Sequence, residues 1–296
     1  MKRLIRFDWA IKRILRNKAN FGILGGFLTE LLGEEISIES ILESESNKET
    51  GDNKSNRVDL LIKNSREELI IIEIQSNRVH DYLMRMLFGT SKLIVDNLDM
   101  GMGYNKIKKV ISVNIVYFDL GVGDDYVYYG TTSFIGVHTA QALLLSREQE
   151  LLYHTNEISK IYPEYYLIKV NQFNDIALNT LDEWIYFLKN EQIKDSFKAK
   201  GLKEAKERLD ILKLSDEERI DYDNYIKDWR DYNSLTVSNY EAGKAIGEAN
   251  KEEYAQIKAK EQQLEMAKRC LAKGMPVEDI AEVTKLDVET IKAMQL

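Results

Sequence analysis

The sequence has few of the residues that build disulfides, histidine metal sites and membrane spans. Its single cysteine, Cys270, cannot form an internal disulfide and has no second thiol nearby to suggest a zinc site. The three histidines are too widely separated for the usual metal-ligand spacing. No stretch approaches the roughly 18 uncharged apolar residues that a membrane-spanning helix needs. These absences exclude a disulfide scaffold, a zinc-finger protein and a helical membrane protein.

Positive charge is also scarce, because 49 acidic residues outnumber 41 basic ones and give a net charge of -8. Any contact with nucleic acid must therefore be local. The densest basic cluster lies in the first 18 residues, and it is either a phosphate-binding surface or a solvated helix face. Its members are Lys2, Arg3, Arg6, Lys12, Arg13, Arg16 and Lys18. Charged residues also interrupt the apolar run that a secretory signal requires, so we expect a cytoplasmic location.

The order of hydrophobic patterns predicts a mixed sheet flanked by helices. Helical spacing indicates a helix or helix pair over residues 8–32, ended by Gly33. Strand patterns follow at 35–46, 57–62 and 69–75, then a helix at 79–98 and an apolar strand at 108–120. Two shorter candidate strands lie at 125–138 and 165–173, and the remainder has helical periodicity. A three-strand hairpin followed by a crossover helix and another strand is an α/β arrangement.

We predict three parts in the chain: a sheet domain at 1–175, a helical extension at 176–240, and residues 241–296. The last part holds a long polar helix and a small helix-turn-helix-like tail, with Gly274 and Pro276 marking the stop and restart. Five acidic residues against two lysines in this tail favour packing or self-association over DNA contact. We expect a homodimer to form through these C-terminal helices.

Two carboxylates interrupt otherwise apolar strands in "NRVDLLIKNSREELIIIEIQSN", residues 56–77. Alternation along a strand places Glu73 and Gln75 on one face. If the hairpin closes with Asn64 opposite Glu68, Asp59 falls opposite Glu73. Directly opposed Cβ atoms lie about 4.5 to 5.5 Å apart, where two carboxylates repel each other. The pair therefore requires a compensating group.

A divalent cation would offset both the repulsion and the cost of burying these charges. Oxygen ligands suit Mg²⁺ best, and such sites commonly act on phosphates. The alternative is a pair of satisfied carboxylates, one held by Arg57 or Arg85 and the other by backbone donors. The spacing alone leaves both interpretations open.

The element order, with "VDLLI" followed by "IIIEIQ", resembles the PD-(D/E)XK nuclease superfamily. The runs "FDWAIKRIL", "NRVDLLIKN", "ELIIIEIQ" and "RMLFGTSKL" are similar to the PD-(D/E)XK nuclease-family transposases, also called recombination-promoting nucleases. The resemblance covers roughly the first 175 residues densely. It implies a restriction-endonuclease-like mixed sheet flanked by helices and followed by an α-helical C-terminal extension. It also implies hydrolysis of DNA phosphodiesters with Mg²⁺, or with Mn²⁺ in its place.

The same resemblance assigns roles at the end of the hairpin. Asp59 and Glu73 match the carboxylates of the family motif and would ligate the metal, with the Ile74 carbonyl as a further ligand. Gln75 stands where the wider superfamily usually has lysine. A neutral amide can orient the attacking water but cannot lower its pKa through charge.

Two further elements enter the expected site through the resemblance. Asp8 and Lys12 match an early D-x-x-F-K-like motif, with Ile11 in place of phenylalanine. One helical turn apart, they either line the metal site, with Lys12 supplying the charge that Gln75 lacks, or form an ordinary surface ion pair. Arg85, in the following helix, would contact a phosphate or pair with Glu73.

The leading prediction is thus a Mg²⁺-dependent DNA endonuclease. The runner-up is a DNA-binding or regulatory protein that retains the nuclease fold with weak or no cleavage. A structural or oligomerising protein with a relic site is a third interpretation. Three outcomes distinguish these interpretations. Cleavage that depends on Asp59 and Glu73 indicates the endonuclease, and DNA binding without cleavage indicates the runner-up. The lack of both indicates the structural protein.

Overall fold

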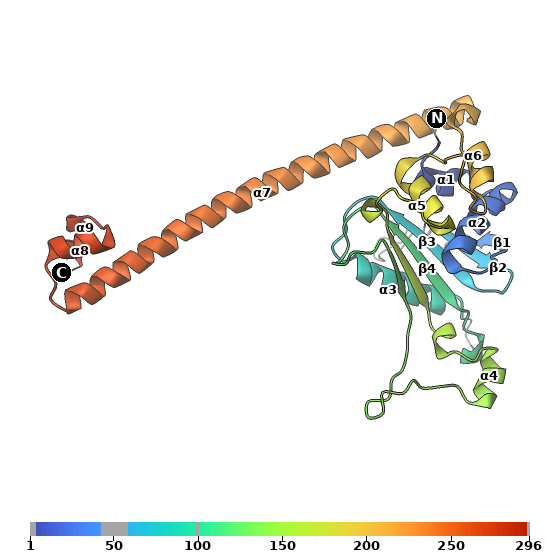
Figure 1. Ribbon diagram of the computed structural model, residues 1–296, viewed down its shortest axis with the longest axis horizontal. Coiled ribbons are helices and arrows are strands. Elements are labelled where there is room, and N and C mark those ends of the chain that lie inside the picture. Colours follow the sequence, from blue (N-terminus) through green and yellow to red (C-terminus); the bar gives the residue numbers. More distant parts are fainter. Residues whose placement is uncertain (1–3, 43–58, 99–100, 295–296) are drawn as a thin grey trace. The chain divides into compact units, whose positions relative to one another are not determined.

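The computed structural model describes residues 4–42, 59–98 and 101–294 (Figure 1). The chain separates into two compact units, one up to Tyr225 and one from Ile226 onward. The boundaries predicted at residues 175 and 240 stay predictions. Among the described residues, no helix combines the length and the apolar character needed to cross a membrane.

A six-stranded mixed sheet forms the centre of the first unit, as expected from the sequence. Its spatial order is β1 (Ile38–Leu42), β2 (Leu60–Asn64), β3 (Leu69–Gln75), β4 (Val110–Val116), β6 (Glu164–Lys169) and β5 (Val127–Gly130). The pairs β1–β2 and β2–β3 are antiparallel, β3–β4 and β4–β6 are parallel, and β5 is antiparallel to β6. Every residue of β4 is buried, which explains its continuous apolar run at the centre of the sheet.

The predicted strands are longer than the observed ones at the far edge of the sheet. The pattern over residues 125–138 yields only the four residues of β5, because the chain leaves the sheet after Gly130. The pattern over residues 165–173 yields β6, and the short 3₁₀ helix η4 (Val170–Gln172) follows it. Elsewhere the predicted order of helices and strands is confirmed, while residues 43–46 and 57–58 of the predicted strands lie outside the described residues.

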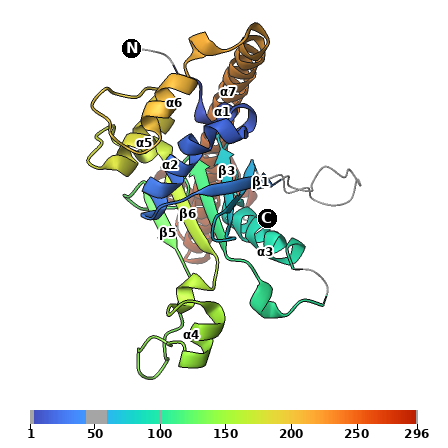
Figure 2. The same cartoon turned by 90° about the vertical axis from the view of Figure 1, so that its right-hand side faces the viewer.

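Helices cover the sheet on both sides (Figure 2). The predicted N-terminal helix pair is confirmed as α1 (Phe7–Arg13) and α2 (Phe21–Leu32), with η1 (Lys18–Asn20) between them. Gly33 ends α2 with a left-handed φ of 70°. α5 (Thr180–Asn190) and α6 (Leu202–Arg208) pack against α2. Edge-to-face or tilted aromatic contacts join α1, α2 and α5 through Phe7, Phe27, Trp184 and Phe187.

The crossover between β3 and β4 contains α3 (Tyr82–Asp96) and η2 (Tyr104–Lys106). The connection between β5 and β6 contains α4 (Arg147–Tyr153) and η3 (Ile158–Lys160). After α6 come η5 (Ile211–Lys213) and the long helix α7 (Asp216–Ala272). The first turns of α7 therefore belong to the unit that contains the sheet.

The second unit contains the rest of α7 together with α8 (Val277–Thr284) and α9 (Val288–Ala293). The predicted stop and restart are confirmed: Gly274 has a φ of 74° and Pro276 is the N-cap of α8. Ala267, Ile280 and Ile291 form a small core, against which the half-buried Cys270 packs. The short helices of the tail thus pack on the last turns of α7.

Candidate active site

The β2–β3 hairpin brings the two carboxylates together at one end of the sheet. Leu60 pairs with Ile72 and Lys63 with Leu69, and the Asn64 N–H donates to the Glu68 carbonyl. This ladder confirms the predicted register, in which Asp59 is opposite Glu73. Asp59 lies in the bend just before β2, while Glu73 lies within β3. Both side chains are largely buried, with 17% and 12% of their surfaces exposed.

Each carboxylate has a basic partner from a different helix. The Lys12 Nζ of α1 lies 2.9 Å from Asp59 Oδ1, and an Arg85 guanidinium nitrogen of α3 lies 3.6 Å from Glu73 Oε2. The Arg16 guanidinium donates to the backbone carbonyl of Asp59 at 3.0 Å. Positive charge therefore reaches the acidic pair from two different helices, α1 and α3.

These cations do not fully compensate the two negative charges. Burial and the neighbouring Asp59 raise the pKa of Glu73 to about 7, although Arg85 and Lys12 lower it. At neutral pH the Glu73 carboxyl is thus about half protonated. An additional cation at the pair would favour ionisation of both groups.

The donor set at the hairpin end fits a small hard cation. The Ile74 N–H donates to Asp59 Oδ2 at 2.8 Å. Because the N–H and C=O of one strand residue point to the same side, the Ile74 carbonyl also faces the side of Asp59. The described part of the chain has no group of three or more His, Cys, Asp or Glu side chains suited to a metal. Two carboxylates and a carbonyl, completed by water and phosphate, match the coordination habit of Mg²⁺.

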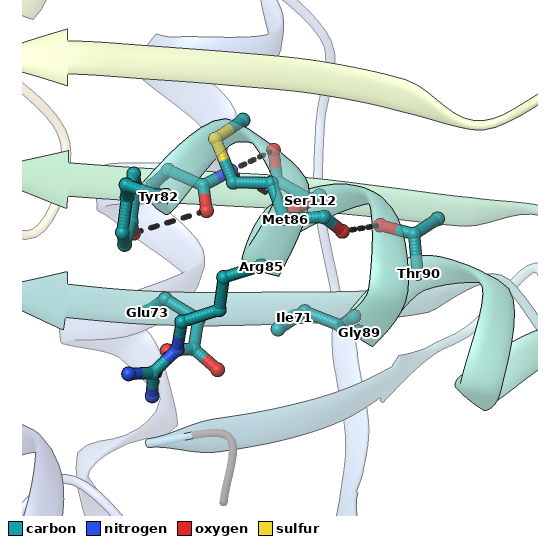
Figure 3. A pocket seen from close by; sticks show the side chains of 9 residues that line it. Ile71, Glu73, Tyr82, Arg85, Met86, Gly89, Thr90 and Ser112 are labelled. Carbon is teal, nitrogen blue, oxygen red and sulfur yellow. Dashed lines mark hydrogen bonds and ion pairs between the residues drawn. The ribbon is translucent and has the colours of Figure 1, made fainter. Parts of the chain in front are cut away.

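A small pocket opens beside Glu73, between α3 and the strands β3 and β4 (Figure 3). The Tyr82 hydroxyl donates to Asn114 Oδ1 at 3.2 Å, and the Asn114 amide donates to Ser112 Oγ at 2.9 Å. Burial raises the pKa of Tyr82 far above its usual value, so the phenol stays a neutral donor. Among the described residues, Arg85 Nε is buried without a hydrogen-bond partner. The pocket is lined by Ile71, Glu73, Tyr82, Arg85, Met86, Gly89, Thr90, Ser112 and Asn114.

Sequence reasoning missed Tyr82 and Asn114. The available signal was a lone amide inside the apolar run "VISVNIV". Parallel pairing sets Asn114 beside Glu73 in the adjacent strand. An amide in a fully buried strand requires polar partners, and the pocket supplies them.

Asp8 lies in a separate buried network and does not pair with Lys12. Its carboxylate accepts hydrogen bonds from the Arg6 side chain, the Trp9 N–H and the Tyr225 hydroxyl of α7. The Ser76 hydroxyl, directly after Gln75 in the chain, lies 3.5 Å from the same carboxylate. Of the two residues in the early motif, only Lys12 contacts Asp59.

The described basic residues among the first 18 make different contacts and do not form one phosphate-binding surface. Arg6 is buried and bonded to Asp8 and Glu191, so it cannot contact a phosphate. Arg13 pairs with Asp221 at 3.3 Å. Lys2 and Arg3, like the candidate partner Arg57, lie outside the described residues. Lys12 and Arg16 are the members of the cluster that contact Asp59.

Gln75 is the last residue of β3, and its half-buried side chain shares the face of Glu73. Its backbone carbonyl accepts the Tyr117 N–H at 3.0 Å, which holds the strand end against the residue that follows β4. The side-chain amide therefore extends from a fixed backbone position next to the acidic pair.

Comparison with known proteins identifies the family. The model described as PD-(D/E)XK nuclease family transposase matches residues 5–238, which include α1, the hairpin and α3. No curated protein and no solved structure matches the chain. The matched region spans well over half of the sequence, and its mixed sheet with flanking helices agrees with the restriction-endonuclease-like fold. The chain belongs to the PD-(D/E)XK nuclease family transposases.

Proposed function

We propose that the protein is a Mg²⁺-dependent endonuclease that hydrolyses phosphodiester bonds in DNA, with Mn²⁺ able to replace Mg²⁺. Family membership supports a nuclease- or transposase-type function. The observation that carries the finer proposal is the opposed Asp59–Glu73 pair, with Lys12 on one side and Arg85 on the other. A structural ion-pair network does not need two acids that face each other, and here Asp59 helps to raise the pKa of Glu73.

In this proposal, Asp59, Glu73 and the Ile74 carbonyl hold the metal. The bound ion would act as a Lewis acid on the phosphate and would favour deprotonation of the attacking water. The Gln75 amide orients that water, because it can both donate and accept a hydrogen bond. Arg85 binds a nonbridging phosphate oxygen through its guanidinium, since its side chain is more than a third exposed.

Lys12 supplies the positive charge that the strand position of Gln75 lacks. Its side chain is half exposed, so the ammonium can reach either Asp59 or a phosphate without crossing the core. Asp8 acts as a positioning residue, because its hydrogen bonds to Arg6, Trp9 and Tyr225 fix the start of the helix that carries Lys12.

Nicking of supercoiled plasmid by the purified full chain tests the proposal. We expect open-circular product with Mg²⁺ or Mn²⁺ and none with EDTA. Salt-sensitive DNA binding without cleavage under every divalent ion would instead favour the DNA-binding or regulatory alternative. If the chain binds neither DNA nor, by calorimetry, a divalent metal, the third interpretation remains, which is a structural role with a relic site.

Moving the positive charge from position 12 to position 75 tests the role of Lys12. We expect Lys12→Gln to lower the nicking rate about a hundredfold, because a positioned charge or proton donor typically contributes about 10² to 10⁴. Adding Gln75→Lys to that variant should recover about tenfold, since the new ammonium lies on the face of Glu73. Lys92→Gln, which removes an exposed α3 lysine paired with Asp96, is the matched control and should leave the rate unchanged. No recovery in the double variant would contradict the assigned role.

A further inference from the structure

A long segment of the first unit buries none of its residues. This segment, called here the β5–β6 arm, comprises residues 131–163, and every residue in it is exposed or half-buried. Figures 1 and 2 both show it leaving the sheet at the end opposite to α1. The arm is therefore remote from the acidic pair, which contacts α1 through Lys12.

Local hydrogen bonds nevertheless give the arm a defined structure. The Gly136 N–H donates to the Gln141 carbonyl, and the Leu143 N–H donates to the Phe134 carbonyl. A capping box on Ser146 then starts α4. Ordering roughly 30 residues costs backbone entropy, which hydrophobic burial normally offsets. The arm by itself has little such burial, because none of its residues is more than half-buried.

The arm exposes apolar rather than basic side chains. Large exposed apolar patches mark surfaces that bind protein. Between residues 131 and 163 there are two basic and three acidic side chains, so the net charge does not attract DNA. The large apolar residues exposed on the arm include Phe134, Val137, Leu143, Leu144, Leu151 and Leu152.

A second unpartnered apolar surface lies on α3. Tyr82, Met86 and Thr90 occupy its inner face and line the pocket beside the sheet. Its outer face exposes large apolar side chains at helical spacing, each about half exposed or more. These outer residues are Leu83, Met84, Leu87, Phe88 and Val95. Because both surfaces are exposed within one copy, the arm does not cover its own α3.

We propose that two copies of the chain form a twofold dimer in which the β5–β6 arm of each copy docks on the outer face of α3 in the other. A twofold contact of this kind covers both apolar surfaces in both copies and leaves no open end. A stable interface needs roughly 20 to 30 residues from each partner, and the arm together with the α3 face supplies that number. The docked arm gains the apolar burial that it lacks in one copy.

The mass of the full chain in solution gives the first test. We expect a dimer at about 10 µM by sedimentation or light scattering, and a monomer when Leu151→Asp or Leu87→Asp places a charge in the interface. Val122→Asp is the matched control, because Val122 is a fully exposed apolar residue outside both surfaces. Melting temperatures near that of the wild type would show that the variants fold.

Site-directed cross-linking gives a second test that does not disturb the surfaces. In a Cys270→Ser background, Leu151→Cys and Leu87→Cys proteins are mixed under mild oxidation. Docking of the arm on α3 is supported if the yield of disulfide-linked dimer in the mixture is well above the yield from either protein alone. Absence of that product would contradict it.

Two other results would overturn the proposal. One is a wild-type chain that stays monomeric up to about 100 µM. The other is a dimer that survives Leu151→Asp and Leu87→Asp but is lost with Ile257→Asp, an exposed apolar residue of α7. That result would assign self-association to the C-terminal helices, as the sequence alone predicts.

Discussion

Asp59→Asn is expected to lower Mg²⁺-dependent nicking of plasmid DNA about a thousandfold or more, because it removes the charge of one of the two carboxylates proposed to bind the metal. The asparagine keeps a side-chain oxygen that can accept the Ile74 N–H, so the hairpin end should retain its shape. We expect Glu73→Gln to have a similar effect. Gel assays of initial nicking rate, together with circular dichroism of each variant, provide the measurement.

Asp96→Asn is the matched control for these variants. Asp96 is an exposed carboxylate at the end of α3, where it forms an ordinary helical ion pair with Lys92. Its replacement should leave the nicking rate unchanged, because pairs of this kind contribute little. If Asp59→Asn and Glu73→Gln cleave as fast as the wild type, and the nicking activity co-elutes with the protein on a sizing column, the acidic pair is not the catalytic centre.

In the absence of metal, the free energy of unfolding is expected to fall as the pH rises from about 4.5 to about 7. The pKa of Glu73 is raised from 4.5 to about 7 in the folded protein. Within this window the folded state holds a proton that the unfolded state has released, so stability decreases with increasing pH. The total loss is about 3 kcal/mol, and it is complete above pH 7. Glu73→Gln cannot ionise and removes this loss.

Urea denaturation in EDTA at pH 5 and pH 8 measures the effect. Between pH 5 and pH 8 we expect the stability of Glu73→Gln to rise relative to that of the wild type by about 2 to 3 kcal/mol, because a small part of the total loss has already occurred at pH 5. Added Mg²⁺ should stabilise the wild type at pH 8 and have little effect on the variant, because only the wild type offers both carboxylates. A difference in stability that does not change with pH would contradict the raised pKa.

Local chemistry explains why the hairpin and its acidic pair could be predicted. The polar turn "NSREE" and the apolar alternation around it determine the register, so residue spacing alone is enough to place Asp59 opposite Glu73. The parallel neighbour of Glu73 could not be found in the same way. It depends on the path of a crossover that contains α3, and no turn constrains that register.

Contacts across long sequence separations account for the other differences. Asp8 and Tyr225 are 217 positions apart, and neither residue is unusual for its helix. Helical spacing therefore suggested a pair between Asp8 and Lys12, whereas tertiary packing gives each a different partner. The shortened β5 has a similar cause, because exposed and buried β-patterned segments look alike until the edge of a sheet is known.

The basic partners of the acidic pair also bear on how the protein would acquire the proposed activity. Lys12 and Arg85 act as built-in counterions, so the hairpin end does not depend on a captured ion to hold its two acids in place. Structural zinc domains, by contrast, are unfolded without their metal. If the pair binds Mg²⁺ as proposed, chain folding and metal loading would be separate events. Newly synthesised molecules would then fold under magnesium starvation and become active when the ion returns.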